Sequence, residues 1–283
     1  MSIFKEEQKQ FGNEYLDIMS LCHDKIIEFP HEIKPSYINL STMTMICDLT
    51  KPIDILNFSE NFRSPSHIDC TIKKPKSNKD YDMTKRGKKK KTFFNQASIH
   101  YTTHTTKCIK VFSNGRLHIT GVTSMTEAAE VCELTCNILN KTIGAVVGEG
   151  AVESVDLKIC MINTNFSINH GIDIIKLRSI LQSTDNYTCS YTPDTYPGLK
   201  IKYTHQKSSN ISSMFIFSSG QVVITGVKLL TDINDVYSTI LDITSLNFKK
   251  IHNPNILVKK KSKKVEYKYG YDLSLIKPCI QLK

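Results

Sequence analysis

The chain has 283 residues, of which 40% are hydrophobic; this length and composition suit a folded protein with a sizeable core and exclude wholesale disorder. No apolar run approaches the roughly 20 residues that a membrane-spanning helix needs, and the N-terminus lacks the basic-then-apolar order of a signal peptide. The nine cysteines form no CxxC pair, so a zinc ribbon is unsupported, and reduced thiols inside a cell are expected.

The net charge of +10 is concentrated in two tracts. Residues 73–91 carry a net charge of +8 and residues 259–268 carry +5, which leaves −3 for the rest of the chain. Tracts of this kind are usually solvated. A nuclear-import signal, an arm that grasps phosphates and a plain flexible loop are all compatible with the composition.

Residues 5–28 are predicted to form an amphipathic helix, because apolar side chains recur there at steps of three or four. Pro30 ends the pattern. The apolar positions are Phe11, Tyr15, Ile18, Cys22 and Ile26. Residues 1–32 hold three Lys against seven Asp or Glu, a charge that would repel nucleic acid. We therefore expect this helix to pack on the body of the protein or on a protein partner.

The most informative feature of the sequence is an internal repeat. Residues 111–122 read VFSNGRLHITGV and residues 216–227 read IFSSGQVVITGV, so seven of the twelve positions are identical. Each block predicts a strand, a tight turn at Ser-Asn-Gly or Ser-Ser-Gly, and a second strand.

A helix signal follows each repeated block. Ser124 and Glu127 make a capping box before AAEVCELTCNIL. In the second copy Thr231 and Asp232 precede INDVYSTILDI and predict a looser cap.

The repeat extends upstream, where residues 42–55 and 161–174 each contain an alternating strand that ends in an Ile-Asp-Ile motif and leads into a short helix. The copies are offset by 119 residues at this motif and by 105 residues at the hairpin. The 14-residue difference makes the Lys-rich tract an insertion in the first copy.

These patterns predict an α+β protein in which two units share one antiparallel sheet of about ten strands, with helices on one face and the other face open. Residues 142–154 are small and Gly-rich and form the expected joint. The expected segments are an N-terminal helical extension 1–33, repeat one 34–141 with the Lys-rich insertion 73–91, repeat two 155–248, and a basic C-terminal extension 249–283.

The two hairpin motifs, one per half, resemble the signature of the TATA-box-binding protein family. The run YTPDTYPGL at residues 191–199 is similar to that family's second stirrup loop. The resemblance covers residues 34–248, and the large insertion resembles the TATA-binding-like proteins of large DNA viruses. It implies a saddle of two pseudo-symmetric halves, with one curved antiparallel sheet and helices on the convex face.

The resemblance also implies a function: a transcription initiation factor that binds AT-rich double-stranded DNA in the minor groove and bends it. A B-type initiation factor and the RNA polymerase machinery are the implied protein partners. The implied location is the nucleus or a viral replication site in the host cytoplasm. No catalytic site, cofactor, metal or membrane partner is expected.

Site residues are carried over from the family by position. The wedges that separate base steps would be Phe94 (with Phe93 as the alternative), Phe112, Tyr196 and Phe217. The flanking strands would contribute Thr120, Thr225, Val223, Phe215, His118, Arg116 and Gln221. The stirrup residues Pro193, Asp194 and Pro197 would contact a protein partner.

Two departures from the family pattern concern how the protein would recognise the DNA sequence. Thr42 and Met161 stand where the family has a central asparagine pair, and Thr44 and Asn163 lie two residues further on the same strand face. Strict preference for a TATA sequence is therefore less well supported than DNA bending.

Two other functions compete with this interpretation. A protein-interaction module that has lost specific DNA binding is favoured by Lys110 and His118 on the expected groove face and by the near-neutral body. An enzyme finds no support in paired carboxylates, a metal cluster, a phosphate loop or a nucleophile motif.

Overall fold

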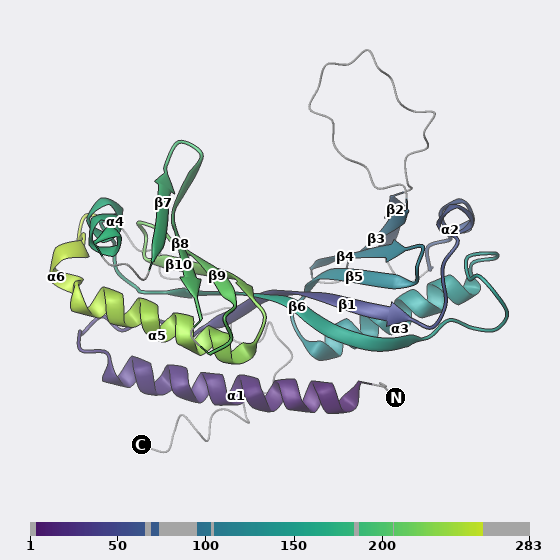
Figure 1. Ribbon diagram of the computed structural model, residues 1–283, viewed down its shortest axis with the longest axis horizontal. Coiled ribbons are helices and arrows are strands. Elements are labelled where there is room, and N and C mark those ends of the chain that lie inside the picture. Colours follow the sequence, from purple (N-terminus) through teal and green to yellow (C-terminus); the bar gives the residue numbers. More distant parts are fainter. Residues whose placement is uncertain are drawn as a thin grey trace, which may run out of the picture. The chain divides into compact units, whose positions relative to one another are not determined.

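A computed structural model describes residues 4–65, 69–73, 95–102, 105–183, 187–205 and 207–256. Their ten strands form one sheet in the order β2-β3-β4-β5-β1-β6-β10-β9-β8-β7 (Figure 1), so the expected α+β class and single antiparallel sheet are confirmed. None of the described helices has the length and hydropathy that a membrane span requires.

The chain divides into two compact units. Unit 1 is Met1–Lys5 with Met43–Cys160, and unit 2 is Glu6–Thr42 with Met161–Lys283. In chain order, the elements up to the joint are α1 (Lys5–Glu28), β1 (Asn39–Leu49), α2 (Ile55–Asn61), β2 (Asp69–Lys73), β3 (Gln96–Thr102), β4 (Thr106–Phe112), β5 (Arg116–Val122) and α3 (Met125–Lys141). Those that follow are β6 (Ser154–Ser167), α4 (Ile174–Gln182), β7 (Thr188–Thr192), β8 (Tyr196–Thr204), β9 (Ile211–Ile216), β10 (Gln221–Val227), α5 (Leu230–Leu246) and α6 (Phe248–Ile251).

Alternation along the strands sends one set of side chains to the helices and leaves the other set half-exposed. In β5 the buried residues Leu117 and Ile119 alternate with the partly exposed His118 and Thr120. The same alternation runs along β4, β9 and β10. Helix α3 covers the buried face in unit 1 and α5 covers it in unit 2 (Figure 1), and the opposite face of each unit is called the open face below.

Both repeated hairpins close on the predicted glycine turns. Gly115 and Gly220 have φ values of +81° and +78°, which an L side chain rarely adopts. Each glycine carbonyl accepts a 2.8 Å hydrogen bond, from the amide of Leu49 in one copy and Ile168 in the other. A Cβ atom at either glycine would lie within 2.4 Å of a backbone carbonyl oxygen, so no other residue fits.

The repeated Ile-Asp-Ile motif starts a short helix in both copies, as predicted. Asp54 and Asp173 are N-caps with nearly identical backbone angles. Their carboxylates accept hydrogen bonds from the amides of Asn57 and Lys176, at 3.0 and 3.1 Å.

The two long helices begin differently. Ser124 caps α3 by accepting from the Glu127 amide at 3.0 Å, and the Glu127 carboxylate accepts from the amide of the preceding Thr123, so the capping signal is confirmed. The looser cap expected at Thr231 and Asp232 is wrong. The N-cap of α5 is Leu229, which makes no side-chain cap bond, because Asp232 is engaged elsewhere.

Helix α1 spans the predicted residues and packs on the body of unit 2. Its buried side chains include Phe11, Ile18 and Cys22. Burial raises the pKa of Cys22 to about 12. The connection that follows α1 is fixed to α5, because the Tyr237 hydroxyl donates a 3.0 Å hydrogen bond to the Ser36 carbonyl.

Candidate nucleic-acid interface

Three aromatic rings gather on the open face of unit 2. Tyr196 opens β8, and Phe215 and Phe217 lie at the end of β9 and in the turn after it. The Tyr196 ring centroid is 5.3 Å from that of Phe215 and 5.7 Å from that of Phe217, both edge-to-face. Tyr196 remains 44% exposed. These three residues, called the aromatic cluster below, were all predicted for this surface.

A glycine makes the cluster possible. A Cβ atom on Gly198 would lie 2.8 Å from Tyr196 Cε1 and 3.1 Å from Phe217 Cε1, closer than side chains normally approach. Beside the cluster, Lys200 Nζ lies 5.8 Å from the centroid of Phe215. A cation over an aromatic face is stabilising and also places positive charge next to the exposed rings. Lys200 was not among the predicted site residues, although its alternation with Gly198 along β8 could have identified it.

Unit 1 places polar side chains at the corresponding positions. Phe112 ends β4, and the preceding open-face residue is Lys110, which pairs across the strands with His118. In unit 2 the same pair is Phe215 with Val223. Partial burial and, to a smaller degree, the nearby Lys110 charge lower the pKa of His118.

Arg116 has a partner that the sequence did not reveal. Its Nε donates to Asp48 Oδ1 at 2.7 Å, across the register that pairs β5 with β1. This hydrogen bond holds the pKa of Asp48 below its usual value. Gln221, the corresponding residue of unit 2, pairs instead with Ser167. A phosphate contact by Arg116 would therefore have to compete with Asp48.

Amide and hydroxyl groups line β1 and β6 in unit 2. Asn163 Nδ2 donates to Thr42 Oγ1 at 3.1 Å, and Asn165 Nδ2 donates to Ser41 Oγ. Asn165 pairs with Val223 of β10, so it shares the open face with the aromatic cluster. Met161 is half-exposed on the same strand. Asn165 and Ser41 were not among the predicted site residues, although Asn165 lies two residues after Asn163 and therefore on the same face of the strand.

The paired threonines lie on the open face, as expected. Thr120 pairs with Thr44 of β1, and its hydroxyl donates to the Cys108 carbonyl at 3.3 Å. Thr225 pairs with Ser213 in β10 and β9. The stirrup residues Pro193, Asp194 and Pro197 are exposed. Phe93, Phe94 and residues 74–91 of the Lys-rich insertion lie outside the described residues.

A serine, a histidine and an aspartate line up on the helix side of unit 2. His205 Nδ1 lies 3.0 Å from Asp235 Oδ2, and Nε2 lies 2.7 Å from Ser212 Oγ. Nucleophilic catalysis requires a hydroxyl that a substrate can reach. Ser212 is 0% and His205 1% exposed, so this cluster ties β9 to α5 and stabilises the fold.

The equivalent tie in unit 1 is an ion pair. Lys107 is 1% exposed, and its Nζ lies 2.6 Å from Glu127 Oε1 on α3. Lys107 and Glu127 correspond to Ser212 and Asp232 at the 105-residue offset of the hairpins. Both repeats therefore join the strand to the covering helix by a buried polar contact at the same position, an ion pair in unit 1 and a hydrogen-bonded Ser-His-Asp cluster in unit 2.

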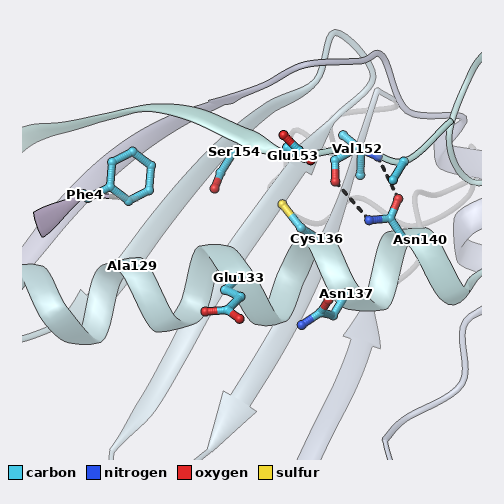
Figure 2. A pocket seen from close by; sticks show the side chains of 10 residues that line it. Phe4, Ala129, Glu133, Cys136, Asn137, Asn140, Val152, Glu153 and Ser154 are labelled. Atoms are coloured by element: carbon cyan, nitrogen blue, oxygen red, sulfur yellow. Dashed lines mark hydrogen bonds between the residues drawn. The ribbon is translucent and has the colours of Figure 1, made fainter. Parts of the chain in front are cut away.

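A hollow of about 360 Å³ lies on the helix side of unit 1, away from the open face. Figure 2 shows Asn140 of α3 exchanging two hydrogen bonds with the backbone of Val152 in the joint, at 2.8 and 2.9 Å. Glu133 and Glu153 supply carboxylates to the lining. No group of three or more side chains suited to a metal ion occurs in the part of the chain that the structure describes.

Comparison with known proteins connects this geometry to a family. Residues 156–245, which include the aromatic cluster, match the model described as transcription factor TFIID or TATA-binding protein. A TATA-box-binding protein-like protein of Acanthamoeba polyphaga mimivirus is 29% identical over 271 residues, covering 84% of this chain and 73% of that protein. The solved Methanococcus jannaschii TBP is 17% identical with a TM-score of 0.49, over 73% of this chain and 97% of that one. The resemblance expected from the repeated hairpins is confirmed by the first two comparisons: residues 156–245 match the TATA-binding protein family model, and the chain as a whole is similar to a viral TATA-box-binding protein-like protein.

Proposed function

We propose that this protein is a transcription initiation factor that binds double-stranded DNA in the minor groove through the open faces and bends it. The observation that carries the proposal is the aromatic cluster, which holds apolar rings on an open sheet face with Lys200 beside them. Rings of this kind can enter between base steps and stabilise an unstacked, kinked duplex.

The surroundings of the cluster support the same function. Val223 pairs with Phe215 of the cluster on one side and with Asn165 on the other, and the Asn165 amide, which donates to Ser41, lies on the same open face. An amide can pair with the acceptors that every A·T pair presents in the minor groove. AT-rich DNA is therefore the proposed target, because A·T steps also lack the guanine amino group that would obstruct a flat sheet.

Protein partners belong to the same proposal. The exposed stirrup residues Pro193, Asp194 and Pro197 flank Tyr196 of the cluster along the chain and face solvent. We propose that this loop contacts a B-type initiation factor, which would bring RNA polymerase machinery to the bent site. The proposed location is the nucleus or a viral replication site in the host cytoplasm, where such machinery works.

A direct test measures binding and bending together. AT-rich and GC-rich duplexes of the same length carry a dye at each end, and energy transfer reports the bend at several salt concentrations. We expect tighter binding and a shorter end-to-end distance with AT-rich DNA, and a fall in affinity as salt rises. Binding without any change in energy transfer would refute bending, and no binding at low salt would refute the function.

The second candidate function is a protein-interaction module. Unit 1 favours it, because Lys110, His118 and the Arg116–Asp48 pair make its open face polar where an apolar groove surface is expected. The DNA test above separates the two functions. A module of this kind would retain partner binding and show no salt-dependent binding of any duplex.

A further inference from the structure

We infer that the part of the chain after α5 positions the Phe217 ring for DNA bending, and that His170 and Phe248 are the positioning residues in this support. The inference rests on the proposed function and adds residues that lie away from the open face. It also adds residues beyond the segment 156–245 that matches the family model.

The turn that carries Phe217, residues 217–220, is bonded to the loop formed by residues 168–172. Two amides of this loop donate 2.8 Å hydrogen bonds to carbonyls of the turn, Ile168 to Gly220 and Ile172 to Ser218. A Cβ atom at Gly220 would lie 2.2 Å from the His170 carbonyl oxygen, so the two backbones are in direct contact. The position of the Phe217 ring therefore depends on residues 168–172, called the supporting loop below.

The supporting loop is in turn bonded to the segment that follows α5. The Asn253 amide donates to the Gly171 carbonyl at 2.9 Å, and the Asp173 amide donates to the Ile251 carbonyl at 2.7 Å. A Cβ atom at Gly171 would lie 2.4 Å from the Asn253 carbonyl oxygen, which leaves no room for a side chain between the two backbones. A displacement of this segment would therefore displace the loop under Phe217.

A stack of rings around Phe248 reinforces these backbone bonds. The Phe248 ring lies nearly parallel to the rings of His31 and His252, with centroid distances of 4.1 and 4.9 Å. His170 of the supporting loop meets Phe248 and His252 edge-to-face, at 4.8 and 5.2 Å. The stack thus joins the supporting loop to the segment after α5 and to the connection that follows α1.

His170 makes this support sensitive to protonation. The residue is 2% exposed, and its Nδ1 donates to the Gly171 carbonyl at 2.9 Å, because a carbonyl oxygen only accepts. The nitrogen that can take a proton is then Nε2, which is buried and has no hydrogen-bond partner among the described residues. Burial lowers the pKa of His170, and the nearby His252 and His31 add to this effect. A proton on Nε2 would be an unpaired buried charge, so protonation favours opening of the stack.

The other titratable groups on the packed elements do not offset such a charge. The neighbours of His170 in the stack, His31 and His252, are themselves bases. Asp173, which follows the supporting loop, accepts from the Lys176 amide and pairs with its ammonium group at 3.3 Å. The remaining charged side chains on the connection after α1, on the last turn of α5 and on α6 are exposed to solvent: Glu32, Lys34, Asp242, Lys249 and Lys250.

Unit 1 has the same backbone support without a buried imidazole. The equivalent hydrogen bonds run from Ile53 to Ser113 at 2.9 Å and from Asp54 to Ala145 at 2.8 Å. At the 119-residue offset His170 corresponds to Lys51, and a Cβ atom at Gly115 would lie 2.4 Å from the Lys51 carbonyl oxygen. The Lys51 ammonium group donates to the Glu149 carbonyl at the surface. A pH effect that acts through a buried histidine is therefore expected at the turn of unit 2 and not at that of unit 1.

Bending of an AT-rich duplex by the full-length protein tests this inference. Energy transfer between end dyes gives the ratio of bent to straight duplex, and a gel shift gives attachment, between about pH 8 and about pH 5, where histidine titrates. We expect the ratio for the wild type to fall at least about 3-fold towards low pH while attachment is retained, because protonated histidines add positive charge. His170→Gln should give a ratio that does not change with pH.

Phe248→Ala removes the centre of the stack and should lower the ratio at least about 3-fold at neutral pH, because it deletes three ring contacts. Thermal unfolding at each pH checks that the proteins are folded. Phe248→Leu, which keeps apolar bulk without a ring, replaces Phe248→Ala if that variant is not folded.

His118 on the open face is the competing source of a pH effect, because its pKa is also lowered. His118→Gln can alter binding, but its ratio of bent to straight duplex should still fall at low pH. A wild-type ratio that is independent of pH, a pH effect lost in His118→Gln and kept in His170→Gln, or normal bending by the Phe248 variant would overturn the inference. A wild type that binds no duplex, or binds without bending at every pH, would overturn the proposed function instead.

Discussion

Gly198→Ala is expected to impair DNA bending while leaving the fold intact. The backbone of Gly198 does not have a positive φ, so alanine is compatible with the strand. The new methyl group would start 2.8 Å from Tyr196 Cε1 and 3.1 Å from Phe217 Cε1. Carbon atoms pack at about 3.5 to 4.0 Å, so at least the Tyr196 ring must swing outward and loosen its contact with Phe217.

The size of the effect follows from the contact that is lost. An aromatic pair contributes about 0.5 to 1.5 kcal/mol beyond its buried area, which corresponds to a roughly 2- to 12-fold change in an equilibrium constant. We therefore expect the ratio of bent to straight duplex to fall by roughly that factor, with little change in attachment through phosphates. Energy transfer across an AT-rich duplex gives the bend, and a gel shift at fixed salt gives the attachment.

Gly12→Ala is the matched control. A Cβ atom at Gly12 would meet nothing within 4 Å, and the residue lies inside α1, so the substitution should stabilise the protein by about 0.5 to 1 kcal/mol and leave bending unchanged. The reasoning fails if Gly198→Ala bends DNA as well as the wild type does, or if both glycine variants bend it equally poorly.

Two further predictions concern stability. Glu127→Ala should destabilise the protein by about 3 kcal/mol in chemical denaturation, because it removes the carboxylate that pairs with the buried Lys107 ammonium and accepts from Thr123. Lys107→Met should cost less, because Glu127 keeps its bond to Thr123; equal costs in the two variants would contradict this prediction. Burial, with smaller contributions from His252 and His31, lowers the pKa of His170, so its stabilising effect is complete above the unfolded imidazole value of about 6.5 and is lost as the pH falls below it. His170→Gln should flatten this pH dependence of the unfolding free energy, and an unchanged profile would assign the dependence to other groups.

Local patterns in the sequence predicted much of the fold. The glycine turns, the two Ile-Asp-Ile helix starts and the Ser124 cap depend on neighbouring residues, so short motifs were sufficient. The cap of α5 was mispredicted because Asp232 binds Ser208 and Asn210, residues more than twenty positions away. A local capping motif does not show whether residues far away in the sequence also bind the capping carboxylate.

The candidate site was predicted unevenly for the same reason. Phe215, Phe217 and Tyr196 could be placed because the hairpin and stirrup motifs resemble those of the TATA-box-binding protein family, from which their positions carry over. Asp48, the partner of Arg116, lies 68 residues away in sequence and becomes its neighbour only through the register of β1 with β5. Charge pairing across a sheet depends on register, which hydrophobic alternation alone does not determine.

The main-chain bonds of the two glycine turns have a consequence for how the repeats can diverge. Each hairpin is anchored through the carbonyl of its glycine and the amide of Leu49 or Ile168, without any side chain from the open face. Substitutions on that face, such as lysine in one copy against phenylalanine in the other at positions 110 and 215, leave this anchor untouched. A duplicated gene with such a scaffold can accumulate different surface chemistry in each half while the framework is inherited unchanged.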